Sequence, residues 1–162
     1  MSHALEKIAF HTLGCKLNFS ETSTVARDFV DKGFSIVKDF ENADIHIINT
    51  CSVTDKADKK AKRIISKIIQ TSDNPYITVL GCYAQLKPEQ IAKINGVNLV
   101  IGDKEKLNVA KHVIDNYDKT NVKVIHSNIN DSNSFTSSFS MNDRVRSYLK
   151  IQDGCDYPCT YC

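Results

Sequence analysis

The residues of this chain that could do chemistry are its six cysteines, which form two groups. The members of one group are far apart along the chain and are Cys15, Cys51 and Cys82. The other group is a compact C-x₃-C-x₂-C cluster within IQDGCDYPCTYC, made of Cys155, Cys159 and Cys162. Because thiolates bind zinc and iron–sulfur clusters, both groups are candidate metal sites.

Composition and the N-terminus predict that these thiols stay reduced. Of the 162 residues, 41% are hydrophobic and 25% charged, as in a soluble globular domain. The net charge of +2 does not by itself indicate a nucleic-acid partner. Without a signal peptide or an apolar run of about 18 residues, we expect a cytoplasmic protein with no membrane partner. The even cysteine count allows disulfides, but a reducing compartment favours metal ligands or reactive thiols.

The hydrophobic pattern predicts the elements that must position these cysteines. Short apolar stretches predict strands over residues 7–12, 34–37, 43–50, 76–81, 97–102 and 121–126. Helical patterns cover residues 19–33, 55–70, 87–94 and 104–117. Ser20 and Asp103 are candidate N-caps, and Gly33 is a candidate C-cap. Alternating strands and helices predict an α/β fold, with an open, mostly parallel sheet and helices on both faces.

The chain divides into three predicted parts. Residues 1–126 form the α/β domain, and the Ser/Asn-rich residues 127–143 form a linker. Residues 144–162 contain one more strand, over 144–154, followed by the terminal cysteines. Since this strand has no predicted partner, we expect residues 127–162 to be loosely held.

The dispersed cysteines are expected to converge. Cys15, Cys51 and Cys82 each follow a predicted strand and precede a helix, and parallel strands present their carboxyl ends at one edge, where ligands bind. Gly14 and Gly81 let the backbone turn beside a thiol, and the helix N-termini favour thiolates. A lone cysteine is often only a small buried residue, but three at equivalent positions favour a ligand set. An iron–sulfur cluster and a zinc ion with an open position both remain possible.

The terminal group favours a cluster over zinc. Three thiolates can bind three irons of a [4Fe–4S] cluster and leave the fourth iron open to another ligand. A zinc site would need a fourth Cys or His at short spacing, and the nearest upstream histidine is His126.

At this point several motifs resemble a known family. The segment LKIQDGCDYPCTYC, with Tyr161 in an aromatic position of the motif, resembles the cluster signature of radical S-adenosylmethionine (SAM) enzymes. With TLGCKLN, NTCSVTDKADKKAKR and GCYAQ, in that order, it resembles the methylthiotransferases that modify tRNA. Within this family, the sequence is most similar to the branch acting on N6-threonylcarbamoyladenosine (t6A). Three features carry this similarity, namely the lysine of LGCKLN, the stretch TDKAD and the segment IQDGC. The resemblance covers residues 12–162.

The resemblance implies an N-terminal methylthiotransferase domain, a radical SAM barrel and a C-terminal RNA-binding domain. This chain would be the first domain and the opening strand of the barrel. The implied reaction inserts a methylthio group at C2 of t6A in the tRNA anticodon loop, with tRNA, a sulfur donor and an electron donor as partners. Such a barrel needs about 250 residues, so that we expect this chain alone to be inactive and to contain no catalytic side chain.

The resemblance also implies two [4Fe–4S] clusters and a SAM site. An auxiliary cluster would be held by Cys15, Cys51 and Cys82. The radical SAM cluster, whose open iron takes SAM, would be held by Cys155, Cys159 and Cys162. Tyr161 would lie near the adenine of SAM.

Two alternatives remain. The chain could be a non-catalytic α/β scaffold that binds an iron–sulfur cluster or zinc. It could also be a flavodoxin-like or receiver-like signalling domain, of which the receiver-like form is disfavoured, because the first and third predicted strands end in threonine and cysteine and lack its acidic cluster. The stretch DKADKKAKR is either the solvated face of an amphipathic helix or a contact for tRNA phosphates.

Overall fold

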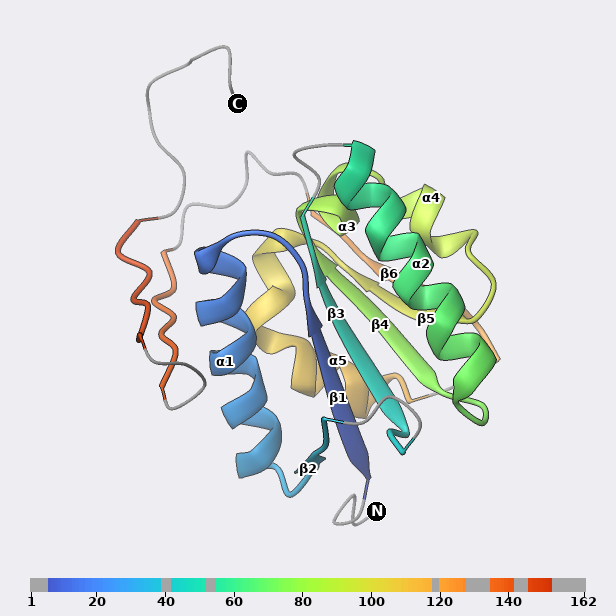
Figure 1. The fold of residues 1–162 in the computed structure, drawn as a ribbon, viewed down its shortest axis with the longest axis horizontal. Helices are drawn as coiled ribbons and strands as arrows, with labels where there is room; N and C mark the ends of the chain where they lie inside the picture. The colour runs from blue at the N-terminus through green and yellow to red at the C-terminus, as the bar shows by residue number, and fades with distance from the viewer. Residues whose placement is uncertain are drawn as a thin grey trace.

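Parallel strands form the centre of this protein. The computed structural model describes residues 6–38, 42–51, 55–117, 120–127, 135–141 and 146–152. Within these ranges, a six-stranded sheet has the order β2-β1-β3-β4-β5-β6, and all its neighbouring strands are parallel (Figure 1). Its strands are β1 (Lys7–Thr12), β2 (Ser35–Ile36), β3 (Ile45–Thr50), β4 (Tyr76–Gly81), β5 (Val97–Ile101) and β6 (Lys123–Ile125).

Helices cover both faces of the sheet, which confirms the predicted open α/β fold. They are α1 (Lys16–Asp31), α2 (Asp55–Thr71), α3 (Cys82–Leu86), α4 (Pro88–Ala92), the 3₁₀ helix η1 (Asp103–Asn108) and α5 (Val109–Asp115). α1 and α5 contribute Phe29 and Val113 to the core on one face, whereas α2 and α3 contribute Ile65 and Tyr83 on the other. No helix in the described ranges has the length and apolar character needed to cross a membrane.

The central strands lie between these two helical layers. Every residue of β3, β4 and β5 is buried, as expected for parallel strands covered on both faces, and this includes the polar residues His46, Asn49 and Thr50 of β3. The strand order reverses between β1 and β3: the chain leaves β1 through α1 toward the edge strand β2, and leaves β3 through α2 toward β4. Ligands of open parallel sheets bind at the carboxyl ends of strands beside such a reversal.

Two predicted helix starts are wrong. α1 begins at Lys16 with Cys15 as its N-cap, whereas Ser20 lies inside the helix and donates a 2.9 Å hydrogen bond to the Leu17 carbonyl. The other wrong start is that of the helix expected over 104–117, which begins as the 3₁₀ helix η1 and continues as α5. Asp103 makes no capping hydrogen bond there, because its carboxylate is engaged by a lysine of the same 3₁₀ helix.

The strand predicted over 144–154 has a partner after all. The structure describes residues 146–152 of it, and Leu149 forms an antiparallel bridge with Phe139. The expectation that this stretch has nothing to pair with is therefore wrong, because residues 135–141 of the predicted linker supply the partner. Both stretches, coloured orange to red, lie beside α1 (Figure 1).

Candidate metal centre at the carboxyl edge of the sheet

The three dispersed cysteines follow three neighbouring strands. Cys15 comes after β1 and caps α1, Cys51 directly follows β3, and Cys82 directly follows β4 as the first residue of α3. Since β1, β3 and β4 are adjacent and parallel, all three cysteines lie at the carboxyl edge of the sheet. Cys15 and Cys51 flank the reversal of strand order. The expected shared edge is therefore observed.

Glycines bring the loops of these cysteines into direct contact. A Cβ atom on Gly14 would lie 2.6 Å from Cβ and 3.3 Å from Sγ of Cys51. A Cβ atom on Gly81 would lie 2.5 Å from the carbonyl oxygen of Thr50. Both glycines have positive φ, of 107° and 95°, which side chains rarely tolerate. Only glycine thus permits the loop before Cys15 to touch Cys51, and the end of β4 to touch the end of β3.

Two buried carboxamides lock the first two loops together. Asn18 Nδ2 donates hydrogen bonds to the carbonyls of Leu13, at 2.8 Å, and Thr50, at 3.0 Å. Asn49 Nδ2 donates in return to the Asn18 carbonyl at 3.1 Å. The Cys15 thiol donates a 3.4 Å hydrogen bond to Asn18 Oδ1. Sequence reasoning did not identify this pair, although an asparagine lies close to a cysteine in both TLGCKLN and NTC.

The Cys82 thiol is less acidic than an ordinary cysteine. Although much of the residue is exposed, burial by surrounding atoms raises its pKa, and Asp103 and Cys51 raise that pKa further against the opposing effect of Lys106. The expectation that a helix N-terminus favours the thiolate is therefore wrong for Cys82. A metal that binds this thiol must displace its proton.

Buried charges lie next to this edge. Lys106 Nζ of η1 is 2.6 Å from Glu21 Oε1 of α1 and 2.6 Å from Asp103 Oδ1. Burial lowers the pKa of Lys106, but the two carboxylates outweigh that effect and raise the pKa above its ordinary value. Lys106 is thus a permanent cation close enough to Cys82 to influence that thiol.

The donor set fits a thiolate-bound metal group, although the ligands are not preassembled. In the described parts of the chain, no three His, Cys, Asp or Glu side chains are arranged to hold a metal ion. The cysteines of the carboxyl edge are nevertheless free thiols, carried by contacting loops at a ligand-binding edge. Metal ligation by Cys15, Cys51 and Cys82 stays a prediction.

The terminal site falls outside the described residues. This applies to Cys155, Cys159, Cys162 and Tyr161 alike. Their predicted roles as ligands of a second cluster and as a contact for SAM also stay predictions.

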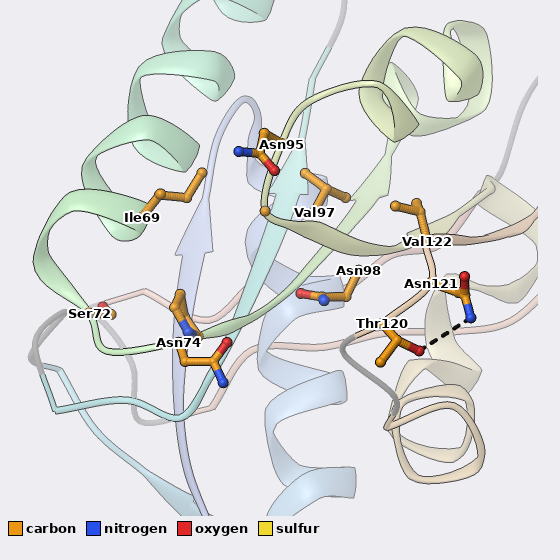
Figure 2. Close-up of a pocket in the computed structure, with 11 residues that line it drawn as sticks. Ile69, Ser72, Asn74, Asn95, Val97, Asn98, Thr120, Asn121 and Val122 are labelled. Atoms are coloured by element: carbon orange, nitrogen blue, oxygen red, sulfur yellow. Dashed lines mark hydrogen bonds between the residues drawn. The ribbon is translucent and has the colours of Figure 1, made fainter.

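A pocket of about 390 Å³ lies at the opposite edge of the sheet (Figure 2). It lies at the amino ends of β4, β5 and β6, where Asn74, Asn95, Asn98 and Asn121 contribute carboxamides. None of its lining residues has an ionisable or thiol side chain. This pocket therefore contains no reactive side chain, whereas the carboxyl edge carries the thiols.

The chain is similar to known proteins over nearly its whole length. The profile of a family described as "Uncharacterized protein family UPF0004" matches residues 7–102. Threonylcarbamoyladenosine tRNA methylthiotransferase MtaB of Bacillus subtilis is 38% identical over 159 residues, which cover 96% of this chain and 35% of the relative. MtaB of Thermotoga maritima is 37% identical over 160 residues, covering 98% and 36%.

A relative named for a different modified nucleoside is less similar. The tRNA-2-methylthio-N(6)-dimethylallyladenosine synthase of Syntrophus aciditrophicus is 29% identical over 161 residues, which cover 96% of this chain and 35% of the relative. The chain therefore spans about a third of the length of each of these relatives.

Proposed function

The chain belongs to the protein family UPF0004, and from this we propose that it is the cluster-binding part of a tRNA methylthiotransferase. The observation that carries the proposal is the placement of Cys15, Cys51 and Cys82 after three adjacent parallel strands. The higher identity to the two MtaB proteins, 37–38% against 29% for the dimethylallyladenosine synthase, favours t6A as the nucleoside modified. A tRNA-modifying protein of this kind would act in the cytoplasm.

The three thiols would hold an auxiliary [4Fe–4S] cluster. Such a cluster, when bound by three protein ligands, supplies one open iron that can carry sulfur for transfer. The protein contributes free thiols at a strand edge, and glycine turns that let the loop before Cys15 contact Cys51. Methylthio transfer would also need the SAM-binding barrel implied by the resemblance, so that we expect no tRNA modification by this chain alone.

The proposal predicts iron and sulfide that depend on the dispersed cysteines. The measurement is anaerobic reconstitution followed by iron, sulfide and zinc analysis of a chain in which Cys155, Cys159 and Cys162 are alanine. This background leaves the carboxyl edge as the site under test. We expect about four irons and four sulfides per chain. Further replacement of Cys15, Cys51 and Cys82 with alanine should remove both.

The matching variant is the reverse one, with the dispersed cysteines replaced and the terminal cysteines kept. Iron that persists unchanged in the chain lacking all six cysteines would be non-specific and would contradict the proposal. Stoichiometric zinc in place of iron would instead favour the scaffold alternative.

The exposed face of α2 is a second part of the proposal, namely a contact for tRNA phosphates. Its cations are all solvent-exposed and are Lys56, Lys59, Lys60, Lys62, Arg63 and Lys67. Asp58 of the same helix is buried and paired with Lys87 at 2.8 Å, so that it does not neutralise that face. α2 begins four residues after Cys51, so that the cations of its first turns, Lys56, Lys59 and Lys60, lie nearest the carboxyl edge.

Reversing three of these charges should weaken tRNA binding and its dependence on salt. We expect Lys59→Glu, Lys60→Glu and Arg63→Glu together to make the slope of log K against log salt shallower by about 2 to 3, because each lost phosphate contact removes about 0.9. Fluorescence anisotropy with a labelled anticodon stem-loop at several salt concentrations measures this slope. The matched control reverses the exposed Lys104, Lys111 and Lys123 elsewhere on the molecule. An equal effect of both triple variants would refute a specific surface on α2.

A further inference from the structure

Three charged residues from distant parts of the chain meet in the protein interior. Glu21 of α1, Lys106 of η1 and Lys150 of residues 146–152 expose only 2%, 6% and 4% of their surface. Charged side chains are almost never this buried unless they are paired. We refer to these three residues as the Glu21 charge cluster.

Glu21 is the centre of the cluster. Its Oε1 atom lies 2.6 Å from Lys106 Nζ and 3.4 Å from Lys150 Nζ. Lys106 also pairs with Asp103, so that two carboxylates face two ammonium groups. Lys150 additionally lies over the ring of Phe135, with 5.9 Å between Nζ and the ring centroid. Removing one charge from such a group leaves its partner buried without full compensation.

Further contacts hold the segment with Lys150 against α1. The amide of Lys150 donates a 2.8 Å hydrogen bond to the Ser138 carbonyl, which joins residues 146–152 to residues 135–141. Ser138 Oγ is 2.9 Å from Ser20 Oγ of α1, and both residues are buried. Arg27 of α1 donates a 2.7 Å hydrogen bond to the Phe139 carbonyl. We refer to residues 135–141 and 146–152 together as the docked pair.

The same charge cluster reaches the carboxyl edge of the sheet. The amide of Asp103 donates a 2.8 Å hydrogen bond to Gln85 Oε1, and Gln85 belongs to α3, the helix that starts at Cys82. The charges of Asp103, Lys106 and Glu21 all influence the Cys82 thiol. A series of polar contacts therefore joins Lys150 to Gln85 of α3, the helix whose first residue is Cys82.

We propose that the Glu21 charge cluster is a positioning device that fixes the segment leading to Cys155 at a set place relative to Cys82. Cys155 is five residues beyond Lys150, so that an extended chain could carry it no more than about 18 Å from the anchored lysine. The hydrogen bonds from α1 hold the docked pair at Ser138 and Phe139, whereas the buried ammonium of Lys150 fixes the stretch that leads to Cys155. In some proteins, buried ionic groups contribute specificity of this kind more than they contribute net stability.

This inference rests on the proposed function only in taking the two cysteine groups as ligands of clusters. If both bind clusters, the charge cluster sets the separation between them. The docking itself needs no metal, so that it can be tested whether or not a cluster forms.

The first test is amide hydrogen exchange of the intact chain with Lys150→Met, which removes the charge but keeps the length of the side chain. We expect the amides of Lys150 and Ser140, which bond to the docked pair's own carbonyls, to exchange about 100-fold faster. Amides of β3 and β4 should keep their protection. Lys150→Arg keeps the charge and should restore most of the lost protection.

Lys16→Met is the matched control. Lys16 of α1 is exposed and lies over the ring of Tyr148 of the docked pair, with Nζ 5.7 Å from the ring centroid. The substitution therefore removes a cation that contacts the docked pair but leaves the buried cluster intact. It should leave the exchange of Lys150 and Ser140 unchanged. Equal protection in Lys150→Met and wild type would overturn the proposal, and so would a loss of protection spread evenly over the sheet.

The second test measures the position of Cys155 directly. Spin labels are attached to Cys82 and Cys155 in a chain whose other cysteines are serine, and the distance distribution is recorded by pulsed electron paramagnetic resonance. Lys150→Met and Glu21→Gln should each broaden this distribution, and Lys16→Met should not. An unchanged distribution in both cluster variants would overturn the proposal, whereas failure to bind iron would contradict only the proposed function.

Discussion

Replacing Gly81 with alanine should lower the free energy of unfolding by at least about 3 kcal/mol. Gly81 has φ 95° and ψ −163°, a conformation that costs residues other than glycine about 1–3 kcal/mol. An alanine Cβ would also lie 2.5 Å from the Thr50 carbonyl oxygen and 2.6 Å from Asn49 Oδ1. Since Thr50 is part of the buried strand β3, its carbonyl cannot move aside without disturbing the sheet. Cys82 follows directly, so that the damage falls on the candidate metal centre.

Gly33→Ala provides the matched comparison. Gly33 also has a positive φ, of 90°, but no atom lies within 4 Å of the position that its Cβ would take. This variant should show only the backbone strain, about 1 kcal/mol. Urea unfolding followed by circular dichroism gives both free energies. Equal losses in the two variants would contradict the close contact between the ends of β3 and β4.

Acidification from pH 6.5 to pH 4 should destabilise the protein through a buried histidine pair. His11 Nε2 of β1 and His46 Nδ1 of β3 are 3.0 Å apart, and both residues are buried. Burial lowers the pKa of each from 6.5 to about 4; the partner ring and Lys67 add to this for His11, whereas the Ala43 carbonyl and Asp44 oppose it for His46. The folded state therefore keeps both rings neutral at pH values where the unfolded chain binds protons.

The sign and size of this effect follow from proton linkage. A lowered folded pKa stabilises the protein fully above pH 6.5, and this stabilisation is lost as the pH falls toward 4. At about 1.4 kcal/mol per pKa unit, each histidine contributes at most about 3 kcal/mol. Unfolding free energies measured by urea titration between pH 7 and pH 5 test this, since most carboxylates are still ionised there.

A variant without the pair should lose this pH dependence. His11→Gln with His46→Gln keeps polar groups in the interior but removes both titrating rings. It should be less stable than wild type at pH 7, yet its stability should change little down to pH 5. His112 of α5 pairs with Glu105 of η1, and His112→Gln should keep the wild-type dependence of stability on pH. A steep slope that survives in the double variant would assign the effect to other groups.

Elements with strong periodicity could be predicted from the sequence. β1 and β4 occupy the predicted residues 7–12 and 76–81, and α2 ends one residue beyond its predicted range of 55–70. Their apolar runs and helical spacing are local properties of the chain. The carboxyl-edge placement of the cysteines follows from the parallel order that such alternation implies.

The start of α1 could not be predicted in this way. Its first turns contain polar residues that are buried, among them Asn18, Ser20 and Glu21. A periodicity argument assigns polar residues to the surface. These residues are buried because each finds a hydrogen-bonding or charged partner in another segment, as Asn18 does at Thr50 and Ser20 at Ser138.

The sequence by itself determined the type and number of the thiols, the α/β alternation and hence the edge at which Cys15, Cys51 and Cys82 gather. The tertiary structure decided which polar groups meet around that edge. Glu21 and Lys150 are separated by 129 positions and still share a buried ion pair. A buried charge is tolerated only where an opposite charge lies next to it. Which charges become neighbours depends on how the whole sheet and its helices pack.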